Sequence, residues 1–250
     1  MTPLNSLYAA TIFLGAFLLF QVQPIIGKMI LPWFGGSAGV WTTCLLFFQS
    51  LLLLGYLYAH WTTGFLKLRI QGIVHLTLLV VSLAALPIAP SANWKPVGTE
   101  DPGLLILGLL AVSIGLPYFL LSANGPLLQA WFAREQPGVV PYRLFALSNF
   151  ASMLALVSYP ILVEPRLAVR TQSTTWSFAY LVFVIICGML VWRGMRPGEP
   201  TQESSSLIAA RGPGAGSLML WVALAACPSI LLMAVTSYLT QNVAPIPLFK

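Results

Sequence analysis

Long apolar stretches separated by short polar ones run through almost the whole chain. Seven of them are predicted to be helices, at about residues 5–30, 38–60, 70–88, 103–122, 143–162, 175–193 and 217–240. A helix needs about 20 apolar residues to cross the hydrocarbon core of a bilayer, and these stretches have roughly that length or more. The pattern therefore predicts an all-α, polytopic transmembrane helical bundle with about seven spans.

The polar stretches divide the chain into three parts. Residues 1–193 form a six-span membrane unit. Residues 194–216 are rich in Gly, Pro, Ser and charge, which is typical of a flexible linker. Residues 217–250 hold the seventh span and end in a polar, proline-containing segment, TSYLTQNVAPIP. We interpret this last part as the start of a truncated second half.

Composition agrees with a membrane protein. Of the 250 residues, 58% are hydrophobic and only 7% are charged. Soluble domains carry about 25% charged residues, so this chain lacks the groups to cover a water-exposed surface. The formal net charge of +6 comes from lysines and arginines scattered through the loops. Such scattering is a topology signal, so we expect the lipid bilayer, and no nucleic acid, as a partner.

The loop charges also predict an orientation. Lysines and arginines at seven positions follow the even-numbered spans: 67, 69, 134, 143, 193, 196 and 211. The opposite loops carry four, at positions 28, 95, 166 and 170. The positive-inside rule therefore favours a cytoplasmic N-terminus.

Side chains that could form a catalytic or metal centre do not cluster in the sequence. Cys44, Cys187 and Cys227 are odd in number and far apart, so they predict neither a disulfide framework nor a metal site. There is no G-x-S-x-G motif, no paired carboxylates in a polar cleft and no Cys/His cluster. We therefore expect no enzymatic activity, no cofactor and no metal from this chain.

The first span becomes polar halfway along, in the stretch Gln21–Trp41 (QVQPIIGKMILPWFGGSAGVW). Pro24 has no N–H and so leaves a helical carbonyl for a neighbouring group to bond. Lys28 is costly in lipid unless it reaches the interface, meets water or finds an anion. Membrane proteins use polar groups beside a helix break to hold or pass a solute, and we interpret Pro24 as such a break.

A faint internal repeat points to a second break. FLLFQVQPII (17–26) and FLLSANGPLL (119–128) share Phe-Leu-Leu and a proline seven positions after the Phe, at an offset of 102. The same offset relates span two to span five and span three to span six. The first six spans are then two inverted three-helix units with helix breaks at Pro24 and Pro126, which is typical of transporters. Chance recurrence in a leucine-rich chain is the alternative.

Several amides near the two prolines are candidate cavity or substrate-binding residues. Such side chains either bond the freed carbonyls or line a solute path, and both interpretations stay open. Within span five, small residues such as Ser148 and Ser152 favour close helix packing. The candidate amides are Gln21, Gln23, Asn124, Gln129 and Asn149.

Lys28 and Glu164 are the charged candidates. Spans one and five end on the same membrane face, so the two side chains could meet. A pair would lower the cost of holding either charge at membrane depth. The alternatives are a Lys28 side chain that extends to the lipid headgroups and a Glu164 that lies in water beside Arg166.

Four long segments resemble a known family. They are QVQPIIGKMILPWFGGSAGVWTTCLLFFQ, LSANGPLLQAWFA, PYRLFALSNFASMLALVSYPILVEPRL and TSYLTQNVAPIPLF. They are similar to the membrane region of fused bacterial proteins in which a major-facilitator-like part precedes a spermidine-synthase-like (polyamine aminopropyltransferase-like) domain. The resemblance covers nearly all 250 residues. It implies a multi-pass protein of the bacterial inner membrane whose first six spans form a major-facilitator-like half.

The same resemblance has two gaps. The synthase-like soluble domain is absent from this chain, so none of that domain's catalytic residues can be carried over. The chain also stops at Lys250, where family members resemble one another in entering a further span, so we interpret it as a fragment. Its expected partners are therefore a small polar solute and either the synthase-like domain or a second membrane half.

Two functions follow for testing. The first is a transporter-like half that moves a small polar solute past spans one and four. The alternative is a non-transporting membrane anchor for the absent synthase-like domain. A cavity lined by the amides and Lys28 favours transport, whereas tight apolar packing around them favours an anchor.

Overall fold

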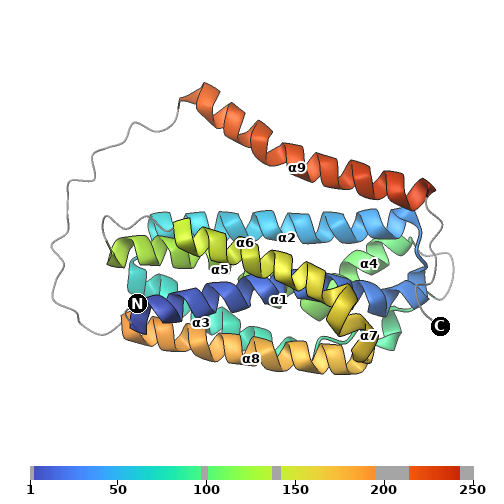
Figure 1. Cartoon of the computed structure of the whole chain (residues 1–250), viewed down its shortest axis with the longest axis horizontal. Helices are drawn as coiled ribbons and strands as arrows, with labels where there is room; N and C mark the ends of the chain where they lie inside the picture. The colour runs from blue at the N-terminus through green and yellow to red at the C-terminus, as the bar shows by residue number, and fades with distance from the viewer. Residues whose placement is uncertain (1–2, 97–100, 137–141, 195–213, 243–250) are drawn as a thin grey trace.

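A computed structural model describes residues 3–96, 101–136, 142–194 and 214–242 (Figure 1). Within these ranges the chain is helical and contains no strand. The elements are α1 (Pro3–Phe34), α2 (Ala38–Phe65), α3 (Leu68–Ser82), η1 (Leu83–Ala85), η2 (Ala92–Trp94), α4 (Pro102–Leu110), η3 (Ala111–Gly115), α5 (Leu116–Glu135), α6 (Tyr142–Ser158), η4 (Tyr159–Val163), α7 (Glu164–Arg166), α8 (Val169–Gly194) and α9 (Ala215–Asn242).

Seven helical stretches of the described chain are long and apolar enough to cross a membrane. They are Asn5–Phe34, Ala38–Phe65, Leu68–Ala85, Pro102–Glu135, Tyr142–Arg166, Val169–Gly194 and Ala215–Leu239. Each overlaps one predicted span, so the prediction of an all-α bundle with seven spans is confirmed. The protein is thus a multi-pass helical membrane protein. The predicted linker lies outside the described residues except at its two ends, because α8 ends at Gly194 and α9 begins at Ala215.

The predicted helix breaks at Pro24 and Pro126 are wrong. Helix α1 continues through Pro24 to Phe34, and α5 continues through Pro126 to Glu135. Prolines are tolerated inside transmembrane helices because neighbouring helices satisfy the backbone groups that they free. Each helix therefore continues through its proline, but with one backbone hydrogen bond missing, because proline has no N–H to donate.

Two π turns interrupt the regular helices instead. One, η3, joins α4 to α5, and the other, η4, joins α6 to the short α7. A π turn adds one residue to a helical turn and rotates everything beyond it, and such turns are frequent at functional sites. The connection between α1 and α2 consists of ordinary helix caps. Gly35 follows α1 with φ +76°, and the Ser37 side chain accepts a hydrogen bond from the backbone N–H of Val40 at the start of α2.

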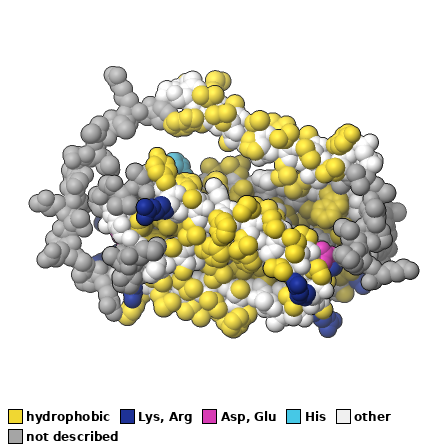
Figure 2. Space-filling model, in the orientation of Figure 1, with side chains coloured by type: hydrophobic (Ala, Val, Ile, Leu, Met, Phe, Trp, Pro, Cys, Tyr) yellow, Lys and Arg dark blue, Asp and Glu magenta, His cyan; other side chains and the backbone are white. Residues whose placement is uncertain are grey.

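Helices α1 and the α4–α5 segment lie at the centre of the bundle. More than half of an 18-residue apolar stretch in each is buried, which is a larger share than in the corresponding stretches of the other spans. Helix α1 packs against α6 and α8, and α5 packs against α2 and α3. Apolar side chains cover much of the outer surface seen in Figure 2, as expected where lipid replaces water. Helix α9 lies beside α2 at the edge and is almost wholly exposed (Figure 1).

Candidate functional site

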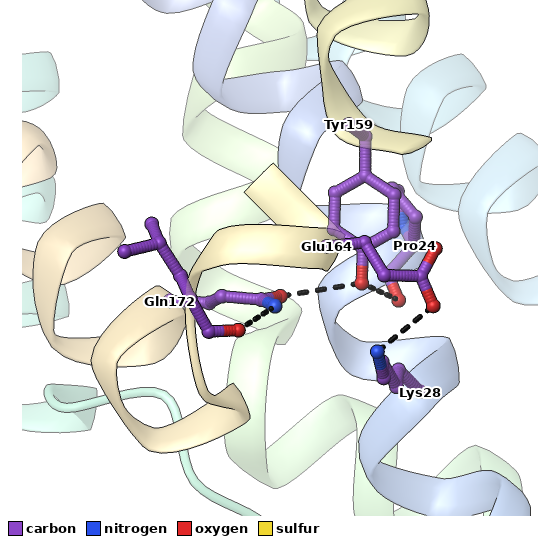
Figure 3. A network of polar contacts seen from close by, with 6 residues as sticks. Pro24, Lys28, Tyr159, Glu164 and Gln172 are labelled. Atoms are coloured by element: carbon purple, nitrogen blue, oxygen red, sulfur yellow. Dashed lines mark hydrogen bonds and ion pairs between the residues drawn. The ribbon is translucent and has the colours of Figure 1, made fainter. Parts of the chain in front are cut away.

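Lys28 of α1 and Glu164 of α7 form an ion pair although they are 136 positions apart. The Lys28 Nζ lies 2.8 Å from the Glu164 Oε1, and Figure 3 shows the two side chains pointing toward one another. Their side chains are 35% and 25% exposed. Either ion alone at this depth would need water or another counter-ion. The pair therefore lowers the free-energy cost of holding each charge in the membrane.

The π turn η4 positions the carboxylate. The backbone N–H of Glu164 bonds the carbonyl of Tyr159, five residues earlier, in place of the usual partner four residues earlier. Pro160 directly follows Tyr159 and Pro165 directly follows Glu164. Neither proline has the backbone N–H that a regular helix would use as a donor. The extra residue therefore turns the start of α7 toward α1, where Lys28 lies.

Tyr159 ties three helical segments together beside this pair. Its hydroxyl donates toward the carbonyl of Pro24, at 3.4 Å, and toward the Oε1 of Gln172, at 3.2 Å (Figure 3). One hydroxyl proton is shared between these two acceptors. The amide nitrogen of Gln172 donates to the carbonyl of Leu167, at 2.8 Å, which holds the glutamine in place. The network fixes α1, η4 and α8 around the ion pair.

A cavity of about 450 Å³ opens next to the ion pair, and we call it the ion-pair cavity. It lies between α1, α2 and the end of α6. The lining residues are Gln23, Pro24, Ile26, Gly27, Lys28, Leu31, Trp41, Cys44, Leu45, Phe48, Leu156, Tyr159, Pro160 and Glu164. The walls are mostly apolar and aromatic, and the charged groups come from the ion pair. Small-molecule sites commonly have this size and this combination of apolar walls and few polar groups.

A second cavity, of about 200 Å³, lies further along the same helices, and we call it the amide cavity. Its walls come from α1, α2, α5 and α6. The lining residues are Ile12, Ala16, Leu19, Phe20, Leu52, Tyr56, Leu121, Ser122, Asn124, Gly125, Pro126, Ser148, Asn149 and Ser152. No charged side chain lines it. The polar groups are amides and hydroxyls.

The predicted site residues divide between these two cavities. Gln23, Pro24, Lys28 and Glu164 line the ion-pair cavity, whereas Asn124, Pro126 and Asn149 line the amide cavity. The sequence predicts one cavity lined by the amides and Lys28, and this is wrong because Lys28 and Asn124 line different cavities.

Gln21 and Gln129 line neither cavity. Gln21 is buried, and its Oε1 has no hydrogen-bond partner among the described residues. Gln129 is half-buried on α5. In a continuous helix, residues two or five positions apart point in different directions, so these glutamines point away from the cavities that Gln23 and Asn124 line. That Gln21 and Gln129 contact a solute stays a prediction.

Sequence reasoning missed Tyr159, Trp41 and Gln172 at this site. Tyr159 and Trp41 look like ordinary interfacial or packing aromatics in the sequence, and Gln172 lies in a separate span. The pair Pro160 and Pro165 around Glu164 is the signal that could have pointed to an irregular turn.

The fold and these cavities define a multi-pass helical membrane protein with charged and amide-lined hollows between its spans. Comparison of the chain with protein-family models, with characterised proteins and with solved structures gives no match.

Proposed function

We propose that the chain is the membrane part of a transporter-like protein that binds a small polar solute in the ion-pair cavity. The observation that carries this proposal is the Lys28–Glu164 pair at the wall of a cavity of about 450 Å³ between transmembrane helices. Charged side chains that face a cavity between transmembrane helices commonly mark a solute path. We further propose that the chain belongs with the membrane regions of the fused synthase-like bacterial proteins that its sequence resembles.

The helix contacts support the proposed two-unit arrangement. Under the offset of 102, α1 is equivalent to α5, α2 to α6, and α3 to α8. Helix α1 packs against α6 and α8, and α5 packs against the equivalent pair, α2 and α3. Each central helix thus contacts the outer helices of the other unit. Transporters built from inverted repeats place their solute site where the repeats meet, which is where both cavities lie.

Charge balance favours a solute that carries both signs. A monovalent ion that displaces one member of the Lys28–Glu164 pair leaves the other member without a partner. A zwitterion with an amine and a carboxylate can replace one ion pair by two and leave the cavity neutral. The apolar walls, including Phe48 and Leu156, then take the remainder of the solute. We therefore propose zwitterionic small molecules, such as amino acids, as the solute class.

Uptake into liposomes that contain the purified chain tests the proposal. The panel compares radiolabelled amino acids with simple carboxylates and simple amines. We expect uptake or saturable binding of a zwitterion in the wild type and at least a tenfold loss in Lys28→Ala and in Glu164→Ala. The double variant should be no worse than either single variant, because the two side chains act as one pair.

Lys95→Ala is the matched control. Lys95 lies on the same side of the bundle, 5.4 Å from the ring of Trp33, and outside the cavity. This variant should retain activity. Additive losses in the double variant would show that Lys28 and Glu164 do not act as one pair. No saturable zwitterion binding by the wild type would favour the anchor function instead.

We also propose that the N-terminus is cytoplasmic. One end of the bundle carries the described Lys67, Arg69, Arg134, Arg143 and Arg193 together with Glu135, and the other end carries Lys28, Lys95, Arg166 and Arg170 together with Asp101 and Glu164. In cells, a membrane-impermeant thiol reagent should label Asn93→Cys and not Arg134→Cys. The reverse labelling would invert the orientation.

A further inference from the structure

The most deeply buried amide of the amide cavity is Asn124. Asn124 is 1% exposed, and its amide nitrogen donates to the carbonyl of Thr11 at 3.4 Å. This bond fixes which way the amide faces, because the opposite orientation would set two oxygens against each other. The Oδ1 of Asn124 is left without a partner among the described residues. A buried acceptor of this kind needs a ligand, a water or an ion.

Two of the serines that line the cavity, Ser122 and Ser152, contribute hydroxyl oxygens whose protons are already used. The Ser122 hydroxyl donates to the carbonyl of Phe119, at 2.7 Å, and lies 3.2 Å from that of Leu51. The Ser152 hydroxyl donates to the carbonyl of Ser148, at 2.9 Å. Since each of these two hydroxyls has one proton and that proton is already used, only their oxygen lone pairs remain for a ligand.

Pro24 and Pro126 each free the backbone carbonyl of a residue that lines the amide cavity. Pro24 removes the N–H that would bond the carbonyl of Phe20, and Pro126 removes the N–H that would bond the carbonyl of Ser122. Phe20 and Ser122 both line the amide cavity. Two carbonyls from different helices, both of residues that line this cavity together with Asn124, are therefore left without their regular donors.

The cavity lies near the middle of the membrane. Phe20 is at the centre of the span Asn5–Phe34, and Leu52 is at the centre of Ala38–Phe65. An Asn149 side chain exposed at this depth on α6 is costly against lipid, which favours a polar content for the hollow. No carboxylate lines the cavity, so a divalent cation would lack charge compensation.

We propose that the amide cavity binds a monovalent alkali cation, and specifically sodium. Asn124 Oδ1, the carbonyls of Phe20 and Ser122 and the serine hydroxyls replace part of its hydration shell. Carbonyl and amide oxygens without a formal charge are the ligands by which membrane proteins hold sodium or potassium. About 200 Å³ leaves room for the ion and several waters. This inference does not depend on the proposed solute, because the two cavities have separate walls.

Binding of radioactive sodium to the purified full chain in detergent tests the inference. Choline chloride replaces sodium chloride at constant ionic strength, and potassium chloride is run in parallel. The wild type should bind sodium saturably and should melt at a higher temperature in sodium than in choline, since a ligand that binds only the folded state stabilises it.

Pro126→Ala is the decisive variant because it restores a helical donor and does not threaten folding. The Ser122 carbonyl then regains its regular partner, and sodium affinity should fall by about tenfold or more. Pro228→Ala is the matched control: Pro228 also lies inside a transmembrane helix, α9, but lines neither cavity, and affinity should be unchanged.

Two results would overturn the inference. One is a wild type that binds no sodium saturably and melts at the same temperature in sodium and in choline, which would mean that water alone fills the cavity. The other is a Pro126→Ala variant that binds sodium as tightly as the Pro228→Ala control.

Discussion

Gly55 of α2 is the position where a single added methyl group should damage the bundle most directly. A Cβ built there would lie 1.9 Å from the Ser122 Oγ, 3.0 Å from the Ala123 N and 3.0 Å from the Phe119 O. The Ser122 side chain can rotate away, but the two backbone atoms belong to α5 and cannot. In Gly55→Ala, α2 must therefore move off α5, and both helices contribute walls to the amide cavity.

The expected cost is that of overpacking a well-packed contact, about 1–3 kcal/mol. The displaced Ser122 hydroxyl also loses its approach to the Leu51 carbonyl. In a chain of this size, such a loss lowers the melting temperature by on the order of 5 °C. The assay is thermal unfolding of the purified protein in detergent, followed by tryptophan fluorescence.

Gly64→Ala on the same helix is the control. A Cβ at Gly64 meets nothing within 4 Å, so this variant should be as stable as the wild type or slightly more stable, because alanine favours helix over glycine. Equal melting temperatures for Gly55→Ala and Gly64→Ala would refute the described packing of α2 on α5.

Two further predictions concern the polar contacts. Tyr159→Phe removes the hydroxyl that joins Pro24 to Gln172 and should destabilise the protein by about 1 kcal/mol in the same melting assay, whereas Tyr142→Phe, at a residue that is 75% exposed, should have no effect; equal effects would contradict the network. Gly15→Ala places a Cβ 2.5 Å from the Asn124 Nδ2, so the amide must turn away from Thr11 and sodium affinity should fall; unchanged affinity would show that the Asn124 orientation is not needed.

The fold class could be predicted because membrane helices leave a strong signal. Each span is an apolar run longer than the hydrocarbon core is thick, and the loops between them are polar. The end of the fourth span could not be predicted from the same signal. The sequence favours a stop near residue 122, before Pro126, but neighbouring helices allow α5 to continue to Glu135.

The site could be predicted only where charge made it conspicuous. Lys28 and Glu164 stand out because an unpaired charge in a span is costly, and their shared membrane face follows from counting spans. The π turn η4 that turns Glu164 toward α1 depends on packing between distant helices, and no local pattern of apolar residues encodes it. Similarly, Tyr159 becomes a network residue only because α1, η4 and α8 meet.

The split into two cavities was also beyond the sequence. Amides at Gln21, Gln23, Asn124 and Gln129 look equivalent because each lies near a proline. Their roles depend on helix rotation through Pro24 and Pro126. If the helices had stopped at these prolines, the rotation would be reset, whereas continuous helices keep the 3.6-residue period and turn Gln21 and Gln129 away from the cavities.

Cys44 gives the most direct test of the central claim, which is that the ion-pair cavity is open to water and to a polar solute. Cys44 lines this cavity, whereas Cys187 is buried elsewhere and Cys227 is exposed on α9. The measurement is the rate at which a charged methanethiosulfonate modifies Cys44 in a Cys187→Ala, Cys227→Ser background. We expect modification, and we expect the bound zwitterion to slow it. If Cys44 reacts with a lipid-soluble maleimide but not with the charged reagent, the claim is contradicted, because the ion-pair cavity would then hold lipid.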